Sequence, residues 1–193
     1  AARRTHEALL SVGVDSKIYS LSGVDRNSDS MKLIHRSISE KTFSSITTII
    51  QGKLIQKTQK LVTPISLEVF DQKLLDSEEF DVLHLHSFYN LLSVKQIRRF
   101  AHRYSDRKLF VTLHDERILT GGCHYTGSCI QNQVECSECP QVHQLFTGLV
   151  QRKFSESRES FTDLNNVTLI APSKWMAIKA QNSQATKKLN CLV

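Results

Sequence analysis

This 193-residue chain has few glycines and almost no prolines, and its seven glycines are widely scattered. None of them builds the Gly-x-Gly-x-x-Gly turn of dinucleotide-binding folds or the phosphate loop of nucleotide hydrolases. The Gly-x-Ser-x-Gly turn that presents the nucleophile of α/β-hydrolases is also missing. The sequence therefore lacks the usual signatures of dinucleotide binding, ATP binding and serine hydrolysis.

The chain also lacks any apolar run long enough to span a bilayer, and its first residues do not resemble a secretory signal. We therefore expect a cytoplasmic protein, with peripheral contact at a membrane surface as a further option. A hydrophobic fraction of 40% and a charged fraction of 23% are ordinary for globular proteins. The net charge of +6 favours anionic partners such as nucleotide sugars, lipid phosphates or nucleic acid, without choosing among them.

Strand patterns alternate with helix patterns along much of the chain. This alternation predicts βαβ units and an α/β, Rossmann-like fold, with a mostly parallel sheet and helices on both faces. We expect one domain over 1–193, with a cysteine-rich loop at 115–145 inserted in it. The expected helices lie at 1–10, 39–61 (broken near 52), 93–104, 141–161 and 173–183, and the expected strands at 16–21, 31–34, 80–86, 108–114, 167–171 and 189–193.

The 39–61 segment carries apolar residues at helical spacing, so we expect this helix to bury one face. The residues of that face are Phe43, Ile46, Ile49, Ile50, Leu54 and Leu61.

Titratable residues follow two of the expected strands. His114 and Asp115 come directly after an apolar strand, and the carboxyl ends of parallel strands are where open α/β sheets place their sites. There an imidazole can exchange hydrogen bonds with a sugar hydroxyl, and a carboxylate can orient it. His84 and His86 share one face of the preceding strand, and His86 lies nearer the same edge. A satisfied core histidine is the alternative for His86.

Ser173 and Lys174 open a helix after another expected strand. Free amide groups at such a position favour anions, so these residues are candidates for substrate binding, although helix capping alone also explains Ser173. Trp175, the only tryptophan, is expected to be a packing residue, with stacking on a sugar ring as the alternative.

Basic residues recur at helical spacing in the 93–104 helix, at Lys95, Arg98, Arg99 and Arg103. They could meet anionic lipid headgroups, although a solvated helix face is the simpler interpretation. Aromatic residues are not interleaved with these charges, so we do not expect nucleic acid as a partner.

Four of the five cysteines fall in one short segment: Cys123, Cys129, Cys136 and Cys139. A Cys-x-x-Cys pair and a second pair on a neighbouring loop can complete a tetrahedral zinc site. The spacing is not that of a standard zinc ribbon, and His124 or His143 could replace one cysteine. An iron–sulfur cluster, free thiols and disulfides remain alternatives, the last being rare in the cytosol. We expect a structural zinc rather than a catalytic one, because four protein ligands leave no open position.

The run HDERILTGGCHYTGSC at 114–129, followed by CSECPQV, resembles the N-terminal domain of retaining GT-B glycosyltransferases of family 4. Members that assemble bacterial polysaccharides carry Gly-Gly-Cys-His-Tyr and Cys-x-x-Cys-Pro after a strand-end His-Asp pair. The resemblance continues in DVLHLH at 81–86 and APSKW at 171–175, so it covers most of the chain.

The resemblance implies a nucleotide-sugar donor, held mainly by a second domain, and a glycan or lipid-linked acceptor held by this one. It implies transfer with retention of anomeric configuration and without a cofactor in catalysis. By this resemblance His114 positions the donor sugar, while Asp115 and the loop with Gly121 and Gly122 shape the pocket.

Family members begin with a strand and a glycine-rich turn, and their second domain carries two glutamates eight residues apart. The opening Ala-Ala-Arg resembles residues just beyond that turn, and no two glutamates here have that separation. We therefore expect a fragment without its first strand and its C-terminal donor domain, inactive by itself. The alternative from another class is a non-catalytic, metal-stabilised binding module for carbohydrate, lipid phosphate or nucleic acid.

Overall fold

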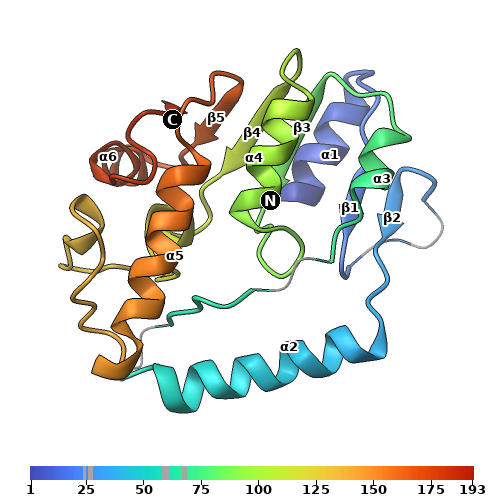
Figure 1. The fold of residues 1–193 in the computed structure, drawn as a ribbon. Helices are drawn as coiled ribbons and strands as arrows, with labels where there is room; N and C mark the ends of the chain where they lie inside the picture. The colour runs from blue at the N-terminus through green and yellow to red at the C-terminus, as the bar shows by residue number, and fades with distance from the viewer. Residues whose placement is uncertain (24, 26–27, 58–60, 67–68) are drawn as a thin grey trace. The chain divides into compact units, whose positions relative to one another are not determined.

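The structure is a computed structural model that describes residues 1–23, 25, 28–57, 61–66 and 69–193 (Figure 1). The chain divides into a smaller unit, Ala1–Thr42, and a larger unit, Phe43–Val193. The α/β class and the parallel strand pairing expected from the sequence are confirmed. Among the described residues, no helix is both long and apolar enough to cross a membrane.

The smaller unit contains helix α1 (Ala2–Ser11) and two parallel strands, β1 (Ile18–Ser20) and β2 (Met31–Leu33). His6 is buried on α1, and its ring nitrogens lie 2.9 Å from Ser16 Oγ and 3.0 Å from Ser30 Oγ. One histidine thus ties the helix to the segments that precede both strands. Residues 24, 26 and 27, between the two strands, lie outside the described part of the chain.

Helix α2 (Ile38–Ile50) is followed by a single π-helical turn, Gln51–Ile55. The expected helix over 39–61 therefore ends earlier, and residues 58–60 and the Leu54 side chain lie outside the description. The expectation of a buried face is wrong, because no described residue of α2 is buried. Phe43, Ile46 and Ile49 are 48%, 50% and 56% exposed. Helical periodicity identifies an apolar face, but it does not identify what covers that face.

The larger unit contains a four-stranded parallel sheet in the order β3-β4-β5-β6. Residue pairing aligns the last residue of β3 with the last residue of β4, so both strands end at the same edge of the sheet. Helices α4, α5 and α6 connect these strands, and the short helix α3 (Gln72–Asp76) precedes them. The bounds are β3 Val82–His86, α4 Val94–Arg103, β4 Lys108–Thr112, α5 Thr147–Ser160, β5 Val167–Ile170, α6 Lys174–Asn182 and β6 Asn190–Leu192.

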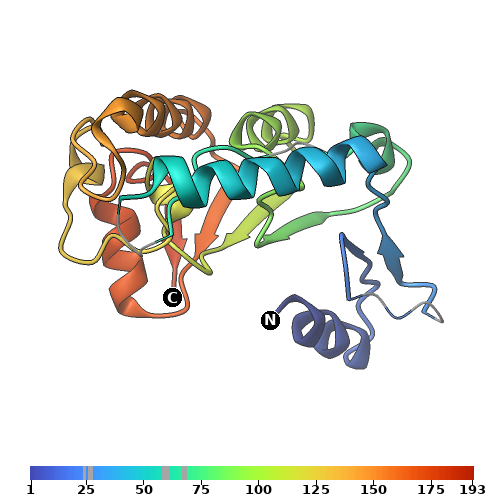
Figure 2. The same cartoon turned by 90° about the horizontal axis from the view of Figure 1, so that it is seen from below.

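Alternate residues of the sheet build the core of the larger unit. Leu109, Val111 and Leu113 are almost fully buried, and so are Phe100 of α4 and Phe154 of α5. These two helices lie side by side on one face of the sheet (Figures 1 and 2). The residues between the buried ones point to the opposite face and are only partly buried, and they include His84, His86, Phe110 and Thr112.

The helix starts follow local capping chemistry where the sequence offers it. Ser93 and Gln96 form a reciprocal capping box at the start of α4, and Ser173 Oγ accepts a hydrogen bond from Met176 N in α6. Helix α5 begins at Thr147, later than the expected 141. Its upstream residues are held elsewhere, because Val142 bridges to Gln56 and the backbone N–H of His143 donates to Ile55.

Three of the four basic residues on α4 pair within the chain. The Arg98 guanidinium donates to the carbonyls of Glu159 and Thr162, at 2.7 Å and 3.0 Å, just where α5 ends. Arg103 pairs with Asp76, and Lys95 with Glu156. Arg98 therefore braces the two covering helices against each other.

Candidate functional site

Three histidines gather on the less buried face of the sheet. Nδ1 of His86 lies 3.0 Å from Nε2 of His114, and Nε2 of His84 lies 2.8 Å from the hydroxyl of Thr112. The His84 and His86 rings stand 4.0 Å apart. His114 itself is exposed. The parallel register thus brings His86 and His114, both expected site residues, to one point on the carboxyl edge of the sheet.

These imidazoles are held in the neutral form. Burial is the main cause that lowers the pKa of His86 from 6.5 to about 4, and the nearby rings of His84 and His114 contribute to the same shift. Burial also lowers the pKa of His84 and of His114. A neutral imidazole can both accept and donate one hydrogen bond, so His114 suits a ligand hydroxyl.

Acidification is expected to destabilise the larger unit through these histidines. Unfolded His86 titrates near 6.5 and folded His86 near 4, so between these values the unfolded state takes up protons that the folded state excludes. The stabilisation is complete above the unfolded pKa and is lost as the pH falls toward the folded pKa. The check is the urea midpoint at about pH 7 and about pH 4.5 in the wild type and in His86→Gln. The variant should lose less stability, and an equal loss would contradict the expectation.

Asp115 is engaged by Arg117. Its carboxylate accepts hydrogen bonds from the backbone N–H of Arg117 at 2.9 Å and from Nε of the same residue at 2.8 Å. His124 Nδ1 lies 3.6 Å from the second oxygen. Among the hydrogen bonds of the described residues, Asp115 makes none with the His114 ring. The carboxylate thus orients a guanidinium and not the neighbouring imidazole.

The guanidinium of Arg117 lies over the ring of Tyr89, 3.9 Å from its centre, and both residues line a shallow pocket that is partly open to solvent. We call it the polar pocket. Its wall combines apolar surface with six hydroxyl-bearing side chains and two cationic ones. Its lining residues are Thr63, Pro64, Ser66, Tyr89, Ser93, Val94, Arg117, Thr120, Gly122, Lys153 and Ser157.

Tyr89 gives the polar pocket an unused donor. Its hydroxyl is buried and has no hydrogen-bond partner among the described residues, and burial raises its pKa. A buried polar group without a partner costs about 1–3 kcal/mol, which a ligand can recover. Neither the sequence patterns nor the family resemblance predicted Tyr89, Arg117 or Lys153 as site residues. Tyr89 and Arg117 each follow a strand end closely, which was the available signal, whereas Lys153 sits within a helix and had none.

The two expected glycines lie on opposite sides of the loop after β4. Gly122 lines the polar pocket and has a φ of +107°, whereas Gly121 lines a second pocket. A Cβ on Gly121 would lie 2.1 Å from the carbonyl oxygen of Val150 in α5. The loop therefore packs directly on α5, which requires a residue without a side chain at Gly121.

The second pocket is lined by all four clustered cysteines, and we call it the thiol pocket. None of them forms a disulfide. Burial raises the pKa of both Cys123 and Cys136 to about 12. Within the described ranges, no group of three or more Cys, His, Asp or Glu side chains is placed to hold a metal ion.

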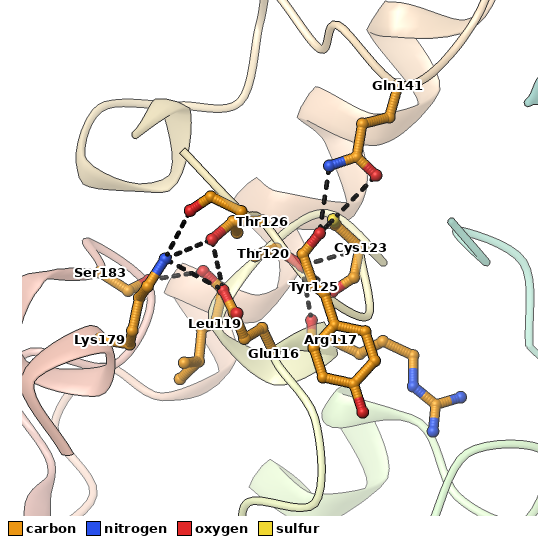
Figure 3. Close-up of polar contacts among 11 residues, drawn as sticks. Glu116, Arg117, Leu119, Thr120, Cys123, Tyr125, Thr126, Gln141, Lys179 and Ser183 are labelled. Carbon is orange, nitrogen blue, oxygen red and sulfur yellow. Dashed lines mark hydrogen bonds and ion pairs between the residues drawn. The ribbon is translucent and has the colours of Figure 1, made fainter. Parts of the chain in front are cut away.

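Buried polar contacts attach the cysteine-rich loop to α6 (Figure 3). The Glu116 carboxylate is fully buried, accepts a hydrogen bond from Thr126 at 2.6 Å and lies 3.7 Å from Lys179 Nζ. Lys179 also donates to the Thr126 hydroxyl at 2.5 Å. Ser183 donates to the Leu119 carbonyl at 2.6 Å. The loop is thus held at two points by the helix that follows β5.

The remaining expected residues lie at the start of α6. Ser173 serves as the N-cap and Lys174 is exposed, and neither lines the polar pocket. Trp175 is more than half exposed and is not a core residue, and Lys179 Nζ lies 5.2 Å from its ring centre. The structure does not bring these residues together with Tyr89 and Arg117 in the polar pocket.

Comparisons with protein-family models, with curated proteins and with solved structures find no match to this chain.

Proposed function

We propose that this chain is the acceptor-side domain of a retaining glycosyltransferase, which moves a sugar from a nucleotide-sugar donor to a glycan or lipid-linked acceptor. The observation that carries the proposal is the pairing of two features near the carboxyl edge of one parallel sheet. One is the exposed His114 hydrogen-bonded to His86. The other is a hydroxyl-lined pocket with an unpartnered tyrosine hydroxyl. Ligands of open α/β sheets bind at this edge.

The lining of the polar pocket suits a polyhydroxylated ligand. Sugar hydroxyls both donate and accept hydrogen bonds, and the pocket offers Ser and Thr hydroxyls that do the same. Tyr89 can donate to a sugar oxygen and so regain the hydrogen bond that it lacks. Arg117 is fixed by the Asp115 carboxylate and can bind a sugar oxygen or an acidic substituent.

In sugar transfer these residues would bind and position the acceptor. The neutral His114 would accept or donate one hydrogen bond to the sugar being moved, and closure against a donor-binding domain would exclude water. Because the sequence contains no pair of glutamates eight apart, we expect this chain by itself to bind acceptor sugars without transferring them. Measurable sugar transfer by the purified chain would contradict that expectation.

The test is binding of a panel of methyl glycosides and short oligosaccharides, screened by saturation-transfer NMR and quantified by calorimetry. We expect at least one glycoside to bind and Tyr89→Phe to weaken it by about 3- to 10-fold, the worth of one hydrogen bond. Because the substitution removes a buried, unpartnered hydroxyl, the thermal stability of Tyr89→Phe should be unchanged or higher.

His102→Ala is the matched control, because His102 is an exposed residue of α4 that does not line the polar pocket. It should bind glycosides as the wild type does. The proposal fails if no glycoside binds, or if Tyr89→Phe binds as tightly as the wild type.

The binding-module alternative is favoured by one observation, the presence of Arg117 and Lys153 in the same pocket. Two cations suit a lipid phosphate as well as an acidic sugar. Binding of inorganic phosphate that competes with no glycoside, and that weakens steeply with added salt, would favour the module.

A further inference from the structure

We propose that the thiol pocket is a structural zinc site, in which Cys123, Cys129, Cys136 and Cys139 bind one Zn²⁺. The inference is independent of the proposed sugar chemistry, because it concerns only how the loop between β4 and α5 is held.

The loop has little regular structure to stabilise it. Between Thr112, where β4 ends, and Thr147, where α5 begins, it contains three single 3-10 turns. Its isolated bridges join Val142 to Gln56 and Cys123 to Val62. Long segments of this kind inside compact domains are uncommon, and a metal is one way to order them.

The fold brings all four thiols to one place although the cysteines are unevenly spaced. Cys123 sits directly after the Gly121–Gly122 turn, Cys136 takes a positive φ of +54°, and Cys139 precedes Pro140. All four line the same pocket, and all four are free thiols. Four cysteines around one small cavity are the ligand set of a closed, tetrahedral zinc site.

One of the sulfurs has polar groups of the loop beside it. Cys123 Sγ donates to the Tyr125 carbonyl at 3.0 Å and to Gln141 Oε1 at 3.3 Å. Zinc binding would displace this thiol proton, because the metal ligand is the thiolate.

The competing explanation is that the thiols act as small apolar side chains. Cys123 and Cys136 do belong to a buried cluster with Val142, Val150 and Phe154. That explanation accounts for the burial of two cysteines but not for the convergence of all four on one pocket. Because the described side chains do not yet form a metal-holding group, binding must draw the sulfurs inward to about 2.3 Å from the ion.

The test uses the reduced protein purified without added metal. Elemental analysis should find about one zinc per chain, and the demetallated protein should take up Co²⁺ with the intense visible absorption of a tetrahedral thiolate site. Cys136→Ser and Cys139→Ser should each lower zinc content or affinity at least about tenfold. Cys191→Ser is the control, since Cys191 lies in β6 outside the pocket, and it should retain the full zinc content.

A second measurement guards against variants that fail to fold. Chelation of zinc from the wild type and from Cys191→Ser should lower the unfolding temperature of both proteins, as expected for an ion that binds only the folded state. The proposal is overturned by a folded, reduced wild type that contains no zinc and takes up no Co²⁺. Octahedral Co²⁺ absorption, zinc retained in Cys136→Ser, or a disulfide between these cysteines would also overturn it.

Discussion

Gly121→Ala is expected to destabilise the larger unit by at least about 3 kcal/mol, at the upper end of the usual overpacking range. The new Cβ would lie 2.1 Å from the carbonyl oxygen of Val150 and 2.6 Å from its Cγ1. Val150 is buried in the first turns of α5, so the clash falls on helix backbone and not on a flexible side chain. Relief requires the loop after β4 to separate from α5, which would open both the polar pocket and the thiol pocket.

The measurement is the denaturation midpoint and the unfolding temperature, which a loss of 3 kcal/mol should lower by about 6–12 °C in a chain of this size. Gly148→Ala is the matched control, because Gly148 lies in α5 and a Cβ there meets nothing within 4 Å. That substitution should stabilise the protein by about 0.5–1 kcal/mol, since alanine loses less backbone freedom than glycine in a helix. If Gly121→Ala and Gly148→Ala both raised or both lowered the free energy of unfolding, the predicted clash at Gly121 would be refuted.

The sequence predicted most of the regular elements because their signals are local. Strands β3, β4 and β5 are short runs that are apolar at alternate positions. Helix α4 begins at Ser93, which forms a capping box with Gln96, three residues later in the sequence. The parallel pairing followed from the alternation of those strands with helices. The position of His86 beside His114 followed in turn from that pairing.

What the sequence did not predict depends on contacts between distant segments. The delayed start of α5 arises because Val142 pairs with Gln56, and Asp115 faces Arg117 because the chain turns immediately after β4. The polar pocket joins segments around Thr63, Tyr89 and Lys153, which no local pattern connects. The periodicity of a segment predicts only whether that segment forms a helix or a strand. A pocket is formed by several elements together, so no local pattern predicts it.

The buried pair Glu116–Lys179 is the clearest case of such a distant contact, and its removal is the second large effect that we expect. Glu116 is 0% exposed and Lys179 is 21% exposed, so the pair lies far less in water than the half-exposed Arg103–Asp76 pair. One carboxylate oxygen contacts Thr126 and Lys179, while the other is buried without a partner among the described residues (Figure 3). Such a carboxylate already lacks part of its hydration, so it depends strongly on the remaining cation.

Lys179→Met should therefore destabilise the protein by about 3 kcal/mol, because it keeps the length of the side chain but leaves the Glu116 charge buried and unpaired. Glu116→Gln should cost less, since the amide retains an acceptor for Thr126 and removes the buried charge. The double variant Glu116→Gln/Lys179→Met should be more stable than the sum of the single effects by about 1–3 kcal/mol, as residues in direct contact usually are. The free energy of unfolding of each of the three variants should be measured by urea denaturation at neutral pH and compared with that of the wild type.

Arg103→Ala is the control for this cycle, because it breaks a half-exposed ion pair in the same unit and should cost no more than about 1 kcal/mol. Strictly additive effects at Glu116 and Lys179 would mean that the two charges do not interact. If Lys179→Met lost no more stability than Arg103→Ala, burial would not make the Glu116–Lys179 pair more important for stability than an exposed ion pair. If coupling is found, the link between the cysteine-rich loop and α6 is electrostatic, and the wall shared by both pockets is held in place by one buried charge.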